Sequence, residues 1–124
     1  KRILVIDDSV DQLDVNKIIL ETAGYEVFSA FGGKEALGIL SEIAPPDLIL
    51  LDFQMDNMSG LDFLLALDDK NPELLKNVPV IFLTAMDKVP ASKAVGFIKK
   101  PIDMDKFLET VSHFIEVGSG RTKH

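Results

Sequence analysis

Acidic side chains stand directly after two short apolar runs of this sequence, and side chains in such positions can bind a metal ion. Asp7 and Asp8 follow the first apolar run of the chain, and Asp52 follows another. Thr84 and Lys100 come at the ends of two later apolar runs. Close carboxylates repel one another, and a hard divalent cation such as Mg²⁺ relieves the repulsion through oxygen ligands. A carboxylate, a cation, an ammonium group and a hydroxyl together suit phosphoryl transfer.

Short apolar runs that alternate with helical patterns must position these side chains. Strands are predicted at residues 3–6, 25–30, 48–51, 78–83 and 95–98. Amphipathic helices are predicted at residues 10–23, 36–44, 61–70 and 103–115. This alternation predicts an α/β fold, a doubly wound sheet of five parallel strands with helices on both faces. Because ligands of such sheets bind beyond the carboxyl ends of the strands, we expect the chemically active side chains to converge there.

Each of these residues taken alone has a simpler interpretation. An Asp pair after a strand is commonly the N-cap and the first-turn acid of the next helix. Asp52 alone could be a turn residue, and Thr84 or Lys100 alone indicates nothing. Only the joint placement of all five side chains at successive strand ends favours a chemical site.

Composition restricts the classes of function. The 124 residues suit one domain, and 47% hydrophobic residues suit an ordinary globular protein. The net charge of −7 argues against direct nucleic-acid binding, which needs a basic face, although acidic charge also serves solubility. The sequence has no Cys, no apolar run near the roughly 20 residues that span a membrane, and no signal peptide. We therefore expect a cytoplasmic protein without membrane contact.

In five segments the chain resembles the receiver domains of bacterial two-component response regulators. The segments are ILVIDDS at 3–9, LILLDFQM at 48–55, MSG at 58–60, FLTA at 82–85 and FIKKPID at 97–103. Each segment alone is a weak signal, but their order and spacing are specific, and the resemblance covers about residues 2–117. It implies a flavodoxin-like fold of the chemotaxis type. The receiver domain would occupy residues 1–117, and residues 118–124 would be a flexible tail or an artificial addition.

The resemblance implies a phosphoacceptor site around Asp52, which would form an acyl phosphate. Mg²⁺, or Mn²⁺ in its place, would be bound directly by Asp8, Asp52 and the backbone carbonyl of Gln54. Asp7 would hold the metal ion through a water molecule. The phosphoryl group would come from the phosphohistidine of a sensor histidine kinase or a histidine phosphotransfer protein. A downstream effector or an output domain would be a further partner.

The same resemblance assigns roles on the last two predicted strands. Lys100 would contact the phosphoryl oxygens, and its peptide bond to Pro101 is usually cis in the family. Lys99 is the competing candidate, and because neighbouring strand residues face opposite ways, only one of the two can reach the site. Thr84 would be the switch hydroxyl, and Phe97 the aromatic side chain that moves with it. Phe97 can also be interpreted as a core aromatic of a buried strand.

Ala85, Gln54 and Met86 would control access to the phosphoryl group and the lifetime of the acyl phosphate. The implied protein is a signalling switch rather than an enzyme, since it would catalyse only its own phosphorylation and dephosphorylation. The alternatives are a degenerate receiver used as a docking module, a metal-dependent phosphatase with an Asp nucleophile, and a flavodoxin-like binding module. The last two fit less well. Gln54 stands where such phosphatases carry a second Asp, and Asp7-Asp8 would repel a phosphate after the first strand.

Two features depart from the family that the chain resembles. Asp56 stands where the family commonly has Pro, and Asp also suits a turn. Only 15 residues separate Thr84 from Lys100. Receiver domains usually carry about six more, which is between one and two turns of helix. The sequence therefore predicts that the fourth helix, between the fourth and fifth strands, is short or irregular and that residues 86–94 are mobile or irregular.

Overall fold

Five parallel strands form one sheet in the computed structural model, which describes residues 1–118. In chain order the strands are β1 (Arg2–Asp7), β2 (Glu26–Phe31), β3 (Leu48–Asp52), β4 (Val80–Thr84) and β5 (Gly96–Lys99). Their order in the sheet is β2-β1-β3-β4-β5, and every neighbouring pair is parallel. The central strands β1, β3 and β4 are buried on both faces, which explains their uninterrupted apolar sequences. The predicted fold class is confirmed.

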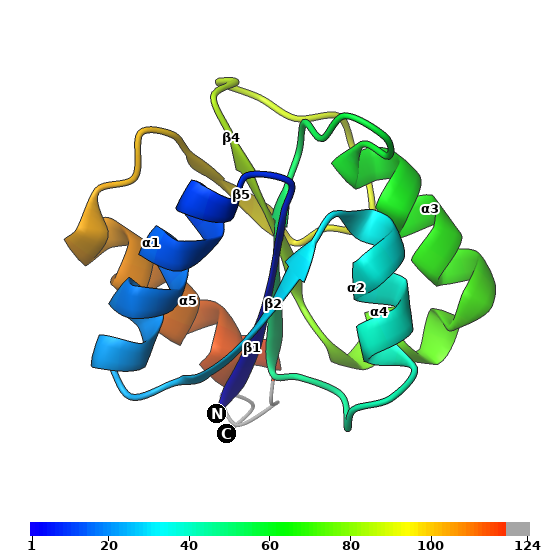
Figure 1. The fold of residues 1–124 in the computed structure, drawn as a ribbon, viewed down its shortest axis with the longest axis horizontal. Coiled ribbons are helices and arrows are strands. Elements are labelled where there is room, and N and C mark those ends of the chain that lie inside the picture. The colour runs from blue at the N-terminus through cyan, green and yellow to red at the C-terminus, as the bar shows by residue number, and fades with distance from the viewer. Residues whose placement is uncertain (119–124) are drawn as a thin grey trace.

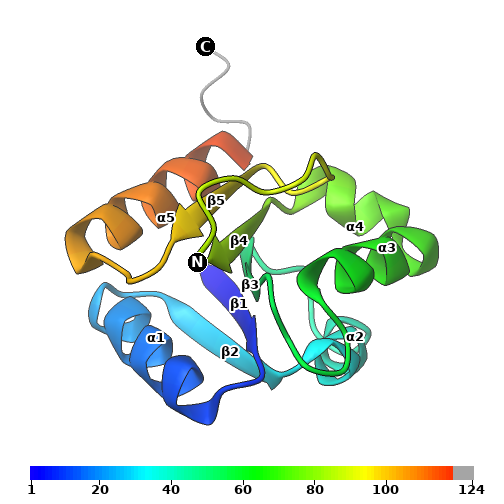
Figure 2. The same ribbon diagram turned by 90° about the horizontal axis from the view of Figure 1, so that it is seen from above.

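Helices cover both faces of the sheet, as Figures 1 and 2 show. One face carries α1 (Val10–Thr22) and α5 (Met104–Gly118). The other face carries α2 (Gly33–Leu40), α3 (Gly60–Lys70) and α4 (Pro72–Asn77). The sheet therefore separates two apolar clusters, one under each layer of helices. This three-layer arrangement buries the central strands, and the buried polar residues of these strands, Asp7, Asp52 and Thr84, all stand at their carboxyl ends.

Side-chain caps fix the starts of two helices that follow strands of the site. Ser9 Oγ accepts a hydrogen bond from the N–H of Gln12 at 3.3 Å and caps α1. Ser59 Oγ accepts from the N–H of Asp62 at 3.1 Å and caps α3. Such caps satisfy N–H groups that the first helical turn leaves unpaired. Since Ser9 directly follows Asp8, the first cap also fixes the path of the chain beside the acidic pair.

The short helix α4 follows α3 and was not predicted. Asn71 ends α3 as expected, but its side-chain oxygen also accepts from the N–H of Leu74 at 3.2 Å and caps α4. Pro72 takes the first position of α4, where a backbone N–H would have no partner within the helix, so its absence costs no hydrogen bond. The Asn71-Pro72 pair therefore both ends one helix and begins the next.

The connection from β4 to β5 contains no helix. Residues 85–95, all of them described, form neither helix nor strand, and we call them the β4–β5 strap. The sequence predicted that the helix between these two strands is short or irregular, and the structure confirms this. That predicted helix is not the element labelled α4, which precedes β4. Two ion pairs hold the strap: Asp87 pairs with Lys99, and Lys93 pairs with Asp68 of α3 at 3.0 Å. The backbone N–H of Val95, at the end of the strap, donates to the Val80 oxygen at 2.8 Å, but no helical hydrogen bonds run along residues 85–95.

Two further observations concern the chain as a whole. Within residues 1–118, no helix combines the length and the apolar character needed to cross a membrane. Of the tail predicted at residues 118–124, only Gly118 is described, and it is the last residue of α5. Residues 119–124 lie outside the described part of the chain.

Candidate functional site

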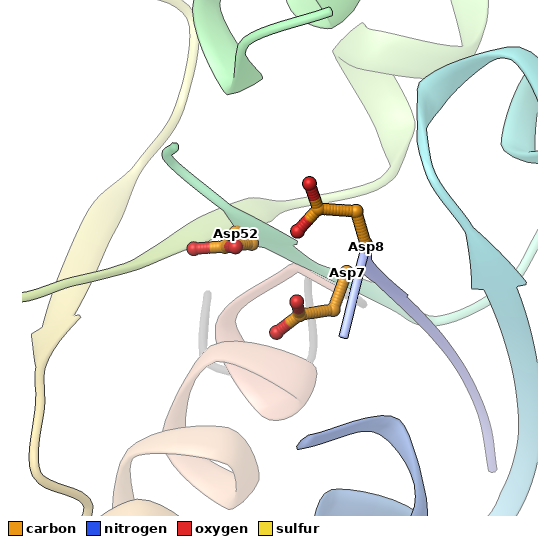
Figure 3. Close-up of side chains that lie close together, drawn as sticks. All are labelled: Asp7, Asp8 and Asp52. Carbon is orange, nitrogen blue, oxygen red and sulfur yellow. The ribbon is translucent and has the colours of Figure 1, made fainter. Parts of the chain in front are cut away.

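Three carboxylates meet where β1 and β3 end. Asp7 is the last residue of β1 and Asp52 the last residue of β3, and these strands are neighbours in the sheet. Asp8 follows directly after β1. One carboxylate oxygen from each residue lies within 4.8 Å of the other two. Figure 3 shows the three side chains together beyond the strand ends, so the structure brings together the acidic residues that the sequence singled out.

The cluster is largely removed from solvent. Asp7 is 1% exposed and Asp52 is 6% exposed, whereas Asp8 is half-buried. Burial raises the pKa of Asp7 from 3.8 to about 6, and the negative charge of Asp52 adds to the rise. The N–H of Ser9 donates to Asp7 Oδ1 at 2.9 Å and opposes the shift. The other oxygen, Oδ2, is buried without a hydrogen-bond partner among residues 1–118.

The loop after β3 packs closely against the acidic cluster. The N–H of Asp56 donates to Asp8 Oδ2 at 2.8 Å. Gly60 begins α3 so close to the site that a Cβ there would lie 2.8 Å from the backbone oxygen of Asp52. Only Gly fits this approach without displacing the backbone. The loop is thus fixed to both strands that carry the carboxylates.

Lys100, and not Lys99, reaches the cluster. Lys100 Nζ donates to Asp52 Oδ1 at 3.2 Å, and its side chain is 28% exposed. Lys99 points away and forms the ion pair with Asp87 of the β4–β5 strap. Lys99 is the last residue of β5 and Lys100 directly follows it, and neighbouring residues of an extended chain face opposite ways. The Lys100–Pro101 peptide bond is cis.

Thr84 ends β4 beside the cluster but does not bond to it. The residue is 2% exposed, and its Oγ1 accepts from the N–H of Met86 at 3.0 Å. Its backbone oxygen accepts from the N–H of Lys100 at 2.7 Å. Thr84 therefore connects Lys100, which directly follows β5, with the start of the β4–β5 strap.

The remaining predicted residues have exposed side chains on β5 and in the loops after β3 and β4. Phe97 is 38% exposed on the outward side of β5, so its interpretation as a core aromatic is not supported. Met86 is also 38% exposed, and Gln54 and Ala85 are exposed in the loops after β3 and β4. All four side chains are therefore open to solvent.

Sequence reasoning missed three contacts in the site and its surroundings. It noted Asp56 as a departure but not its hydrogen bond to Asp8, and it gave no role to Asp87, the partner of Lys99. It included Gly60 in a motif without its close approach to the β3 backbone. The first two contacts depend on loop paths that no periodicity reveals. An isolated Gly after a turn was the one available signal of close approach.

The donor set fits a hard divalent cation. The oxygens come from three carboxylates, two of them buried, and Asp7 Oδ2 lacks any partner within residues 1–118. Burying several negative charges together is costly unless a cation or a proton neutralises them. The pKa of Asp7 is raised first by burial and then by the negative charge of Asp52, and a bound cation would oppose both effects. Oxygen-only ligands suit Mg²⁺ or Mn²⁺.

Comparison with known families identifies the domain. A family model described as the response regulator receiver domain matches residues 3–112. The chain belongs to the response regulator receiver domains. As a receiver of the chemotaxis type, it carries its acidic cluster at the point where the strand order of the sheet reverses, between β1 and β3.

Relatives of this receiver have been described in several bacteria. The polar-differentiation response regulator DivK of Brucella ovis is 31% identical over 121 residues, covering 93% of this chain and 96% of that protein. The chemotaxis protein CheY4 of Vibrio cholerae superposes with a TM-score of 0.80 at 30% identity, covering 91% of this chain and 97% of that one. The response regulator TrrA of Thermotoga maritima, solved in complex with Mg²⁺-BeF, superposes with a TM-score of 0.78 at 31% identity, covering 92% and 98%.

Proposed function

We propose that this receiver is a phosphoacceptor switch that takes a phosphoryl group onto Asp52 in a Mg²⁺-dependent reaction. The donor is the phosphohistidine of a sensor histidine kinase or of a histidine phosphotransfer protein. The observation that carries the proposal is the contact of Asp52 with Lys100 at 3.2 Å beside two further carboxylates. A nucleophile, an ammonium group and a set of oxygen ligands thus meet at one edge of the sheet.

The residues of the site divide the work of the transfer. A carboxylate oxygen of Asp52 forms a bond to phosphorus while the phosphorus–nitrogen bond of the donor breaks and its electron pair returns to the imidazole. Lys100 already neutralises the Asp52 carboxylate, and after transfer it neutralises the phosphoryl oxygens instead. Thr84 and Ala85 border the space that the phosphoryl group enters. The exposed Ala85 leaves this space open because its side chain is a single methyl group.

The cation would be held by Asp8 and Asp52 directly, by the backbone carbonyl of Gln54, and by Asp7 through water. When bound, it supplies positive charge that offsets the charge of the carboxylates and of the incoming phosphoryl group. The partnerless oxygen of Asp7 and its raised pKa support this assignment. The complex of TrrA with Mg²⁺-BeF adds support from a relative.

The switch would operate through Thr84 and Phe97. In this structure the Thr84 hydroxyl is bonded to the N–H of Met86 and not to the acidic cluster. Phosphorylation would draw the hydroxyl toward the phosphoryl group and break this bond. Phe97, which is 38% exposed, would then pack inward behind Thr84. Such a change shifts the balance between two conformations, and a downstream effector or output domain would bind one of them.

This switch acts on itself and not on a separate substrate. The site lacks a second Asp two residues after Asp52, where Gln54 stands with an exposed side chain. An Asp at that position would be needed to protonate the leaving group of a phosphate ester. We therefore propose that catalysis is limited to phosphorylation of Asp52 and hydrolysis of its acyl phosphate.

Beryllofluoride tests the proposal because it mimics an acyl phosphate on a carboxylate. In the presence of Mg²⁺ it should shift the backbone amide signals of Thr84, Met86 and Phe97 in ¹H–¹⁵N spectra. Asp52→Asn should abolish these shifts, whereas the matched variant Asp62→Asn on α3 should keep them. Unchanged spectra of the wild-type protein, or equal shifts in Asp52→Asn, would refute the assignment of Asp52.

A further inference from the structure

The loop after β3 donates a backbone hydrogen bond to a proposed metal ligand. The N–H of Asp56 lies 2.8 Å from Asp8 Oδ2, a contact across 48 positions of the sequence. Asp8 comes from the end of β1 and Asp56 from the loop after β3. The bond therefore links the two segments that together carry the acidic cluster.

The bond exists because of the residue type at position 56. The family that this chain belongs to commonly has Pro there, and Pro has no backbone N–H. With Asp56 the chain gains a donor at the place where the carboxylate of Asp8 needs a partner. The side chain of Asp56 is exposed, so its carboxylate can be changed without removing the backbone N–H that bonds to Asp8.

The N–H has two physical effects on the cluster. Hydrogen bonds to ionised carboxylates are short and roughly twice as strong as neutral ones, so the bond fixes the orientation of Asp8. Within residues 1–118, Asp8 Oδ1 accepts no hydrogen bond and stays available for a cation. The positive end of the N–H dipole also offsets part of the repulsion that Asp8 feels from Asp7 and Asp52.

We infer that Asp56 is a positioning residue for the cation: its backbone N–H holds Asp8 in the orientation that binds Mg²⁺. The inference rests on the proposed function, because it assumes that Asp8 is a metal ligand. The carboxylate of Asp56 makes a second, distinct contribution, since it adds negative charge at the rim of the site. The hydrogen bond acts at a contact distance of 2.8 Å, well inside the Debye length, so salt weakens it little. The attraction between the exposed carboxylate of Asp56 and a cation acts over a longer distance through solvent and is screened by salt.

Mg²⁺ titrations followed by ¹H–¹⁵N chemical shifts separate the two contributions. Asp56→Pro removes both the N–H and the charge, and Asp56→Asn removes the charge alone. We expect Asp56→Pro to weaken Mg²⁺ binding about tenfold at about 0.5 M salt, a factor worth about 1.4 kcal/mol, and by up to about threefold more at about 0.05 M salt, where the lost charge also counts. Asp56→Asn should weaken binding by no more than about threefold, and that loss should vanish at the higher salt concentration.

A second measurement does not depend on the folding of the Pro variant. In the metal-free wild-type protein, the amide proton of Asp56 should resonate downfield and exchange slowly with solvent, as expected for a donor to a carboxylate. Asp8→Asn should move this signal upfield and speed up its exchange. An Asp56 amide that exchanges as fast as the neighbouring Asn57 amide and ignores Asp8→Asn would overturn the inference.

The outcomes distinguish this inference from the proposed function. Wild-type protein that fails to bind Mg²⁺ would overturn the metal-dependent function and the role of Asp56 with it. Wild-type protein that binds Mg²⁺ with the same affinity as Asp56→Pro would overturn only the role of Asp56. A loss in Asp56→Asn as large as that in Asp56→Pro would assign the effect to charge and remove the role of the N–H.

Discussion

Replacing Asp7 by Asn is expected to stabilise the folded protein at neutral pH while impairing its site. Burial and the neighbouring Asp52 raise the pKa of Asp7 from 3.8 to about 6. A difference of about two pKa units between the folded and unfolded states corresponds to about 3 kcal/mol, since each unit is worth about 1.4 kcal/mol. Asn keeps an oxygen that can accept from the N–H of Ser9 but carries no charge.

The sign of the effect follows from proton binding. Between about pH 4 and pH 6 the folded protein holds the Asp7 proton while the unfolded chain has lost it. The free energy of unfolding of the wild-type protein therefore falls as the pH rises through this window and stays lowered above it. Asp7→Asn lacks this penalty, so its advantage should grow from near zero below pH 4 to at most about 3 kcal/mol at pH 7.

Urea unfolding at several pH values between 4 and 8, in the presence of a chelator, measures this difference. Mg²⁺ should reduce the advantage of Asp7→Asn, because the cation binds the folded wild-type protein and offsets the repulsion among the carboxylates. Asp14→Asn is a matched control, since Asp14 lies exposed on α1. A stability difference that does not change with pH would refute the reasoning, as would an equal difference in the control.

Three further variants test other contacts. Lys100→Met should slow phosphorylation by acetyl phosphate about a hundredfold, as measured by mass spectrometry of the intact protein. Lys99→Met should stay near wild type, because that side chain points away from the site; equal rates in both variants would contradict the assignment. Asn16→Val should raise the free energy of unfolding by about 1–3 kcal/mol, because Asn16 is 1% exposed and neither amide atom has a partner within residues 1–118. Destabilisation in urea would show instead that buried water satisfies the amide. Gly60→Ala should cost about 1–3 kcal/mol in thermal unfolding, since its Cβ would meet backbone at 2.8 Å, whereas Gly38→Ala meets nothing within 4 Å and should not destabilise.

The sheet and the approach of the carboxylates could be predicted because both follow from strand periodicity. Uninterrupted apolar runs identify strands buried on two faces, and parallel strands place their carboxyl ends at one edge. Asp7 and Asp52 end neighbouring strands, so their approach required no knowledge of loops. Periodicity alone left the choice between Lys99 and Lys100 open, because alternation shows that the two diverge but not which one faces the site. The resemblance to receiver domains assigned the role to Lys100.

Helix ends and loop contacts could not be predicted in the same way. Residues Ile43 and Ala44 extended the apolar pattern of the second helix, yet α2 ends at Leu40. The sequence predicts that a helix ends at residue 70 and predicts none directly after it, yet Pro72 begins α4. The hydrogen bond between Asp56 and Asp8 joins loops whose paths depend on the packed structure. These features arise from tertiary contacts, which leave no period in the sequence.

The β4–β5 strap changes how a signal can travel from the acidic cluster to the surface. A helix in this place would move as a stiff rod, because its backbone hydrogen bonds join every turn to the next. The strap is tied down mainly by side chains, among them Asp87 and Lys93, so no ladder of helical hydrogen bonds couples one stretch of it to the next. We therefore expect effectors of this protein to bind a non-helical segment that adopts its bound conformation during binding, and not a preformed helix.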